Sequence, residues 1–192
     1  MKKRFLFPCL LLVTSLVACG GGAAKGEEKN KSDFDVIAAQ REKENASEYT
    51  KATLKMKHYQ KVEGRSGTLN YTVEYEKKDG EWSILSGGDE LPSSHYGTFI
   101  NFTMSYAEQF VLLLKGNLAQ DAEPKYYVAD AAATLEIAGT ADTANAKGKI
   151  FASATWNKDG LLTKWHEKDN FTYYMGYNNC VIEETFNFTY SK

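Results

Sequence analysis

Apolar and polar residues alternate one by one through long stretches of this chain, and this period restricts its fold more than any other feature. In residues 69–76 the odd positions are apolar or aromatic and the even positions polar: Leu69, Tyr71, Val73 and Tyr75 against Asn70, Thr72, Glu74 and Glu76. Successive side chains of a β-strand point to opposite faces, so this alternation predicts a strand with one buried and one solvated face. We therefore expect an antiparallel sheet, in which one face is commonly exposed to water.

Further segments carry a strand-like pattern. They are residues 54–62, 82–84, 126–128, 133–138, 146–156, 161–168, 171–175 and 181–190. Two hairpin turns are expected, at residues 77–80 (Lys-Lys-Asp-Gly) and 157–160 (Asn-Lys-Asp-Gly), because glycine adopts the positive φ of a tight turn. The segment 64–67, which contains two glycines, is interpreted as a loop between strands.

Two other segments have helical features. Ser32 is placed as an N-cap before apolar residues at helical spacing, which predicts a helix over residues 33–47. A second helix is expected from Ser105, the start of a capping box, to Gly116, with only apolar residues over 110–114. A helix that is apolar on all sides is buried, so we expect it against the concave face of the sheet. The predicted fold class is α+β: a strongly curved antiparallel sheet (half-barrel) with an N-terminal helix and a buried central helix.

The beginning of the chain has the layout of a secretory signal peptide. Three positive charges at residues 2–4 precede a mostly apolar run over 5–17, and this run is shorter than the roughly 20 residues that cross a bilayer. Residues 16–19, Leu-Val-Ala-Cys, resemble the lipobox of bacterial lipoproteins. The resemblance implies cleavage after Ala18, a diacylglyceryl thioether with acyl chains such as palmitate at Cys19, and anchoring to a membrane of the bacterial cell envelope. An ordinary signal peptide, cut elsewhere, is the alternative.

Three parts of the chain follow from this reading. They are a lipoprotein signal peptide (1–18), a lipidated flexible tether (19–31) and a single α+β domain (32–192). The tether is rich in glycine and then in charge, so it buries too little apolar surface to offset its conformational entropy. Removal of the signal peptide takes away three positive charges and changes the formal net charge from −2 to −5. Such a domain lacks the basic surface that binds nucleic acid.

Little in the domain points to catalysis. Cys180 is the one cysteine left after the tether, so no intramolecular disulfide is expected, and its position in an apolar run favours a small buried side chain. The histidines His58, His95 and His166 are far apart, and the pair His166-Glu167 lacks the second histidine of a zinc-protease helix. No nucleophile elbow, phosphate loop or dinucleotide fingerprint occurs. We expect no metal, no cofactor and no catalytic residue; an envelope enzyme assembled only by folding is the less favoured alternative.

The expected order of strands, buried helix and further strands resembles the half-barrels of the LolA and LppX/LprG lipoprotein-carrier families. Residues 157–164, Asn-Lys-Asp-Gly-Leu-Leu-Thr-Lys, are similar to a hairpin common in them. The resemblance covers most of residues 33–190 as a pattern and implies the half-barrel. A curved sheet like that of the cystatins or of nuclear transport factor 2, or another antiparallel fold, is the alternative.

Aromatic residues are the remaining signal. The chain contains 12 Tyr, 10 Phe and 3 Trp residues. Rings at alternating positions have three interpretations. They fill the core of the sheet, they line an apolar cavity under the helix, or they are exposed and contact sugars or partner proteins. The candidate ligand-binding residues are Tyr71, Tyr75, Trp82, Trp156, Phe186 and Phe188. The function expected is binding of an apolar or lipid-like ligand, and the alternative is a structural lipoprotein that binds a protein or glycan through a filled domain; the sequence names no protein partner.

Overall fold

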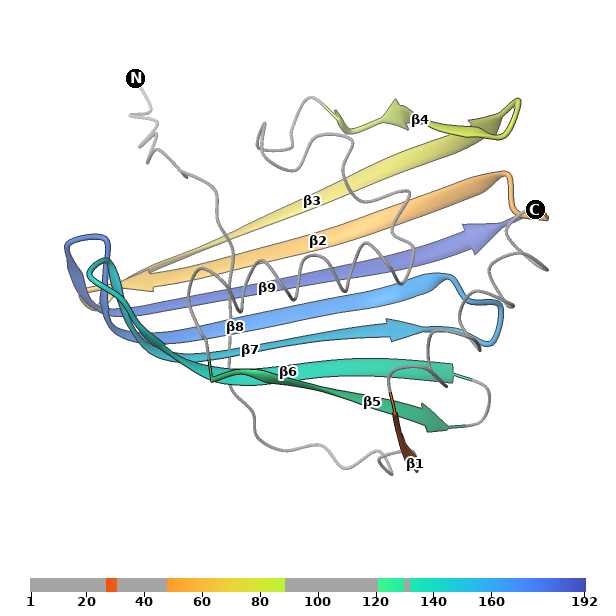
Figure 1. Ribbon diagram of the computed structural model, residues 1–192. Helices are drawn as coiled ribbons and strands as arrows, with labels where there is room; N and C mark the ends of the chain where they lie inside the picture. Colours follow the sequence, from red (N-terminus) through yellow and green to blue (C-terminus); the bar gives the residue numbers. More distant parts are fainter. Residues whose placement is uncertain (1–26, 31–47, 89–120, 130–131) are drawn as a thin grey trace, which may run out of the picture.

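The computed structural model describes residues 27–30, 48–88, 121–129 and 132–192, and all structural statements below refer to these residues. They form one sheet of nine strands (Figure 1). The strands are β1 (Glu27–Lys29), β2 (Lys51–Val62), β3 (Arg65–Lys78), β4 (Glu81–Ser86), β5 (Glu123–Ala129), β6 (Ala132–Asp142), β7 (Ala146–Trp156), β8 (Leu162–Tyr174) and β9 (Tyr177–Ser191).

Strand β9 lies inside the sheet and joins two runs of hairpin-connected strands. The order across the sheet is β1-β5-β6-β7-β8-β9-β2-β3-β4, and neighbouring strands are antiparallel. β9 pairs with the distant β2 over the whole length from Lys51↔Ser191 to Lys61↔Val181. β1 and β4 are the two edges, so the sheet is open (Figure 1).

The predicted α+β class is wrong for the described residues, in which every regular element is a strand. The helices expected over 33–47 and 105–116 lie outside the described residues. An open antiparallel sheet therefore replaces the expected half-barrel with an N-terminal and a buried central helix. The sheet also begins inside the segment expected to be a tether, because β1 pairs with β5 from Glu27↔Val128 to Lys29↔Tyr126. In the described part of the chain, no helix is long and apolar enough to cross a bilayer.

The turns follow from residues that accept positive φ. Asp79 and Gly80 have φ of 53° and 87° and connect β3 to β4, which confirms the hairpin predicted at 77–80. The connection at 157–160 is closed by Asn157, whose Oδ1 accepts hydrogen bonds from the backbone N–H groups of Asp159 and Leu161, both at 3.0 Å. The segment 64–67 is not a loop as predicted: the turn ends at Gly64, and β3 begins at Arg65.

Strand β8 is continuous where the sequence pattern predicts two strands, over 161–168 and 171–175. Its pairing with β7 shifts register between Thr155 and Trp156. This bulge places Leu162 and Trp165, three positions apart, both in the core. Thr163, between them, donates a hydrogen bond from its Oγ1 to the carbonyl oxygen of Thr155 at 3.1 Å. The bulge therefore interrupts the alternation of apolar and polar residues within the predicted strand 161–168.

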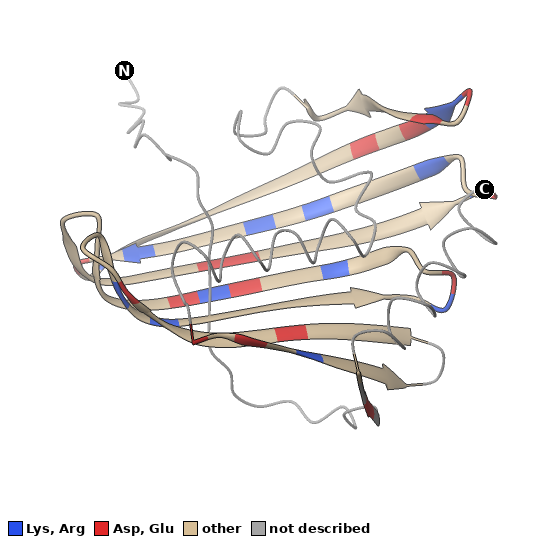
Figure 2. Ribbon diagram, viewed as in Figure 1, with Lys and Arg blue, Asp and Glu red and all other residues tan. Residues whose placement is uncertain are grey.

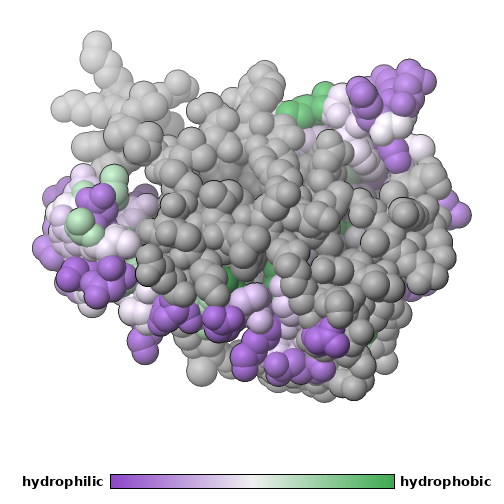
Figure 3. Space-filling model, viewed as in Figure 1, coloured by the Kyte–Doolittle hydropathy of each residue, from purple (hydrophilic) through white to green (hydrophobic). Residues whose placement is uncertain are grey.

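The core lies on one face of the sheet. Side chains of this face meet in cross-strand register over seven strands, and we call this series the apolar row: Tyr71, Met56, Phe186, Trp165, Ala154, Leu135 and Tyr126. All members except the half-buried Tyr71 are buried. Among the coloured residues of Figure 3, hydrophilic ones gather at the hairpin ends on the left, along the lower edge and at the β3–β4 hairpin on the upper right, with small apolar patches between them.

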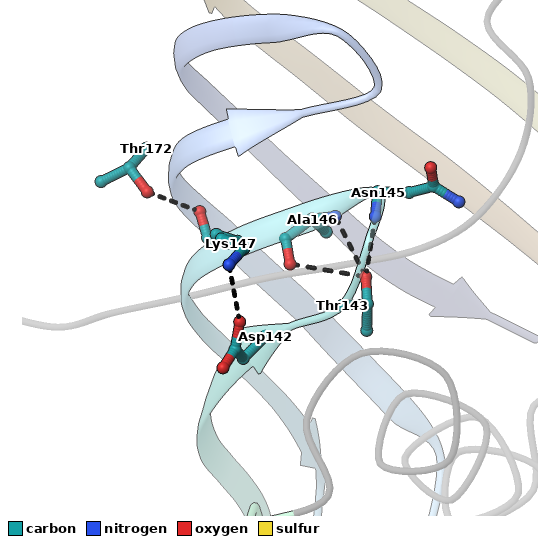
Figure 4. Close-up of polar contacts among 6 residues, drawn as sticks. All are labelled: Asp142, Thr143, Asn145, Ala146, Lys147 and Thr172. Atoms are coloured by element: carbon teal, nitrogen blue, oxygen red, sulfur yellow. Dashed lines mark hydrogen bonds and ion pairs between the residues drawn. The ribbon is translucent and has the colours of Figure 1, made fainter.

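The turn between β6 and β7 is held by side chains as well as by backbone (Figure 4). Thr143 donates its backbone N–H to the carbonyl oxygen of Ala146 at 2.8 Å, and its Oγ1 accepts from the N–H groups of Asn145 and Ala146 at 3.3 and 3.0 Å. Lys147 Nζ lies 3.3 Å from Asp142 Oδ1. Thr172 Oγ1 on β8 donates to the carbonyl oxygen of Lys147 at 3.0 Å, which ties this turn to β8.

Candidate functional site

Two carboxylic acids lie on the apolar face of β8. Past the bulge, Trp165, Glu167, Asp169 and Phe171 alternate with polar residues and all point into the core. Glu167 is 3% exposed and Asp169 is 1% exposed, and they are the buried charged residues of the described part of the chain. Carboxylic acids are rarely buried to this extent without a partner.

A third carboxylic acid extends this group onto β9. Glu184 pairs across the strands with Glu167 on one side and with His58 of β2 on the other. Its Oε1 lies 2.6 Å from His58 Nδ1. The side chains of His58 and Glu184 are 12% and 16% exposed, so the group reaches solvent at this end. We call Glu167, Asp169 and Glu184 the acid cluster; Figure 2 shows acidic positions next to one another along β8 and β9.

The members of the acid cluster differ in their hydrogen bonds. Trp165 donates its indole N–H to Glu167 Oε2 at 2.9 Å. Neither carboxyl oxygen of Asp169 has a hydrogen-bond partner among the described residues. An unsatisfied polar group in a protein interior costs about 1–3 kcal/mol, and a charged one more. Asp169 is therefore the energetically least favourable buried group on this face.

Burial and mutual repulsion favour the protonated forms of these acids. Burial raises the pKa of Glu167 well above its ordinary value, the charge of Glu184 raises it further, and the hydrogen bond from Trp165 lowers it. Burial likewise raises the pKa of Asp169 well above its ordinary value, followed by the charges of Glu167, Cys180 and Glu184. In the protonated form each acid can donate a hydrogen bond; in the ionised form each attracts a cation.

The opposite face of the same strands has a contrasting arrangement. Glu183, next to Glu184 in sequence, contacts Lys168 Nζ at 2.9 Å and His166 Nε2 at 3.2 Å. Burial alone would raise the pKa of Glu183, but the hydrogen bonds from Lys168 and His166 lower it below its ordinary value. Glu183 therefore has a lysine and a histidine as partners, while Glu167 and Asp169 have no basic partner among the described residues.

Cys180 borders the acid cluster as a buried free thiol. It pairs across the strands with Phe171. Burial raises the pKa of Cys180, although a hydrogen bond with the Gln60 side chain opposes the change. A thiol with a raised pKa is a poor nucleophile, which agrees with the small buried side chain predicted from the sequence. Within the described ranges, no three His, Cys, Asp or Glu side chains are placed to hold a metal ion together.

The structure brings all six predicted aromatic residues to the apolar face of the sheet. Tyr71 and Phe186 flank Met56 on opposite sides. Four of the six are at most 3% exposed, and two are half-buried against the core: Tyr75, Trp156, Phe186 and Phe188, then Tyr71 and Trp82.

Two of these rings are connected through a tyrosine that the sequence analysis did not select. Tyr190 stacks on Phe188 with ring centres 6.5 Å apart and meets the edge of Trp82 at 6.5 Å. Its hydroxyl donates to the carbonyl oxygen of Leu162 at 2.8 Å. Burial raises the pKa of Tyr75 to about 12, and its hydroxyl has no hydrogen-bond partner among the described residues. Trp156 lies apart on β7, opposite Leu162 and Ala133.

No protein-family model and no curated protein matches this sequence. Among solved structures, the chain is similar to the Mycobacterium tuberculosis lipoprotein LppX, with 11% identity, a TM-score of 0.31 and coverage of 85% of this chain and 97% of that chain. It is also similar to the ywiB protein of Bacillus subtilis, with 8% identity, a TM-score of 0.23 and coverage of 74% of this chain and 93% of that chain. Neither similarity is strong enough to assign a fold or an activity to this chain.

Proposed function

We propose that this chain is a lipoprotein of the bacterial cell envelope, anchored by lipid on Cys19, whose sheet binds an apolar or lipid-like ligand and catalyses no reaction. The apolar row carries the proposal, because it continues across seven strands of an open sheet without a polar interruption. Apolar ligands bind in sites that are lined mainly by apolar side chains, where a few polar groups fix their orientation. The lipobox-like residues 16–19 support the anchoring part.

The test is native mass spectrometry of the lipidated chain purified from bacterial membranes, followed by titration with a fluorescent apolar probe. A co-purified apolar molecule at a fixed ratio and saturable probe binding are expected. Tyr71→Ala, on the apolar face, should weaken probe binding, whereas Tyr59→Ala, on the other face of the neighbouring strand, should leave it unchanged. A chain that carries no apolar molecule and does not bind the probe would contradict ligand binding.

A second candidate is a lipoprotein that binds a protein or a glycan and whose apolar face is filled by its own side chains. The burial of Tyr75, Trp156, Phe186 and Phe188 favours it, because these rings are already in contact with protein atoms. In that case Tyr71→Ala lowers stability without any change in probe binding. The two candidates are therefore separated by the same pair of variants.

A further inference from the structure

The burial of the Asp169 carboxyl group without a hydrogen-bond partner is a feature that the fold alone does not explain. Its carboxyl group is 1% exposed, and neither oxygen has a hydrogen-bond partner among the described residues. Buried polar groups in native proteins are nearly always satisfied, so an unsatisfied group needs a specific reason such as a bound ligand. Asp169 lies two positions from Glu167 on the buried face of β8, so its carboxyl group is on the same side of the sheet as the rest of the acid cluster.

The acid cluster has more carboxyl oxygens that can accept hydrogen bonds than it has neighbouring donors among the described residues. The basic side chain beside it is His58, whose Nδ1 lies 2.6 Å from Glu184 Oε1. The lysine between Glu167 and Asp169, Lys168, points to the opposite face and contacts Glu183. Like charges on directly paired strands repel, so a positive group placed among the three carboxyl groups would be stabilised.

The surroundings select the kind of cation. A metal ion does not fit, since no suitable group of three ligands exists among the described residues. The side chains beside the acids in the same strands are apolar or aromatic: Trp165 and Phe171 on β8, and Ile182 and Phe186 on β9. A ligand here must therefore place an ammonium group among the acids and an apolar part along the apolar row. The solvent contact of His58 and Glu184 gives the charged end a route to water.

We propose that Asp169, Glu167 and Glu184 bind the protonated amine of an amphiphile whose hydrocarbon part lies along the apolar row. This inference rests on the proposed function and specifies its ligand class. A primary ammonium group has three N–H donors, and each hydrogen bond that it makes to a charged acceptor is stronger than one between neutral groups. Ionisation of the acids, disfavoured by burial, becomes favourable when the cation enters.

The test compares ligands with the same alkyl chain and different head groups on the full chain. Dodecylamine, dodecanol and dodecanoate are titrated by competition with the apolar probe, and butylamine serves as an amine without a long chain. Dodecylamine should bind about tenfold or more tightly than dodecanol, and dodecanoate more weakly than both. Butylamine should not compete.

Variants identify the residues responsible. Asp169→Asn and Glu167→Gln, which keep shape and remove charge, should each abolish the advantage of dodecylamine and leave dodecanol binding unchanged. Glu183→Gln, next to Glu184 on the opposite face, is the control. It should change neither the affinity for dodecylamine nor that for dodecanol. The folding of each variant is checked by circular dichroism and thermal unfolding, and Glu167→Gln serves if Asp169→Asn does not fold.

Each other outcome overturns a defined part of the proposal. Equal binding of dodecylamine and dodecanol would show that the acid cluster is not an amine site, while the proposed function stands. Butylamine binding as tight as that of dodecylamine would show a cation site without a chain site. Absence of binding by all three long-chain ligands would contradict the proposed function itself.

Discussion

Gly148 shows how closely two strands approach at a single position. It lies beside the register shift between Lys147 and Gly148 on β7, with φ of 156°. A Cβ atom at this position would lie 2.3 Å from the carbonyl oxygen of Asn170 and 2.6 Å from the Cα of Phe171. These are backbone atoms of the paired strand, so they can move only if the pairing between β7 and β8 changes.

Gly148→Ala should therefore lower the free energy of unfolding by about 1–3 kcal/mol, measured by urea denaturation. Gly67→Ala is the control, because no heavy atom lies within 4 Å of a Cβ built there. Gly67→Ala should lower the free energy of unfolding much less than Gly148→Ala. Equal losses for the two variants would show that the close approach at Gly148 does not constrain the sheet.

Asp169 predicts a dependence of stability on pH. Its pKa is raised in the folded chain, so the folded state binds more protons than the unfolded state above the unfolded value of about 3.9. The stabilisation is fully present below that value and is lost as the pH rises through the folded pKa. The maximal slope is about 1.4 kcal/mol per pH unit for one proton.

The free energy of unfolding should therefore fall from pH 5 to pH 8 in the unmodified chain and fall less in Asp169→Asn, as measured by urea denaturation at each pH. Asn resembles the protonated acid, so the variant should be close to the unmodified chain at pH 5 and more stable at pH 8. The double variant with Glu167→Gln should flatten the profile further. Parallel profiles would contradict the assignment of the pH dependence to these acids.

The positions of most core side chains could be predicted from alternation alone, as for Val73 and Tyr75. Glu167 and Asp169 were missed although they share the phase of Trp165 and Phe171. The first predicted strand ended at residue 168 because Asp169 and Asn170 are polar, whereas β8 continues through them to Tyr174. A continuous reading of 165–171 would have placed both acids on the apolar face. The lack of a partner for Asp169 depends on the folded structure and has no sequence signal.

At the scale of elements, β2 connects the two halves of the sheet. It pairs with β3 on one side and β9 on the other, and Leu54 in its first half pairs with Val73 and Phe188. Leu54 is fully buried, whereas Lys55 points to the other face and is exposed. Packing at Leu54 therefore stabilises two strand pairs at once.

Leu54→Ala should lower the free energy of unfolding by about 2–5 kcal/mol, because it removes buried methyl groups and leaves a cavity between three strands. Lys55→Ala, one position along the same strand, should cost much less. Chemical denaturation of both variants makes the comparison. A loss at Leu54 no larger than that at Lys55 would mean that β2 is not part of the cooperative core.

The existence of the strands could be predicted better than their arrangement. The turn at Asp79 and Gly80 carries a local signal, and the structure has a hairpin there. The pairing of β9 with β2 has none, because it joins residues as distant as Lys51 and Ser191. Local alternation fixes which face of a strand is buried and leaves the neighbour on each side undetermined.

At the scale of the whole molecule, anchoring is predicted to depend on one atom, the Sγ of Cys19, which lies outside the described residues. Cys19→Ser should move the protein from the membrane fraction to the soluble fraction or leave uncleaved precursor. Intact mass should show a diacylglyceryl group and acylation on the unmodified chain. An unmodified Cys19, or a mature chain that begins elsewhere, would refute lipidation.

The position of β9 has a consequence for how the chain acquires its structure. It is the last strand in chain order, yet it separates β8 from β2 in the sheet. During synthesis or export, β2–β4 and β5–β8 emerge before the strand that unites them, so neither half gains its inner partner early. Pairings that span such sequence distances fold slowly, because long loops must close first. Such a topology postpones the completed sheet until residues 177–191 have emerged, which agrees with the proposal that this chain is exported as a lipoprotein.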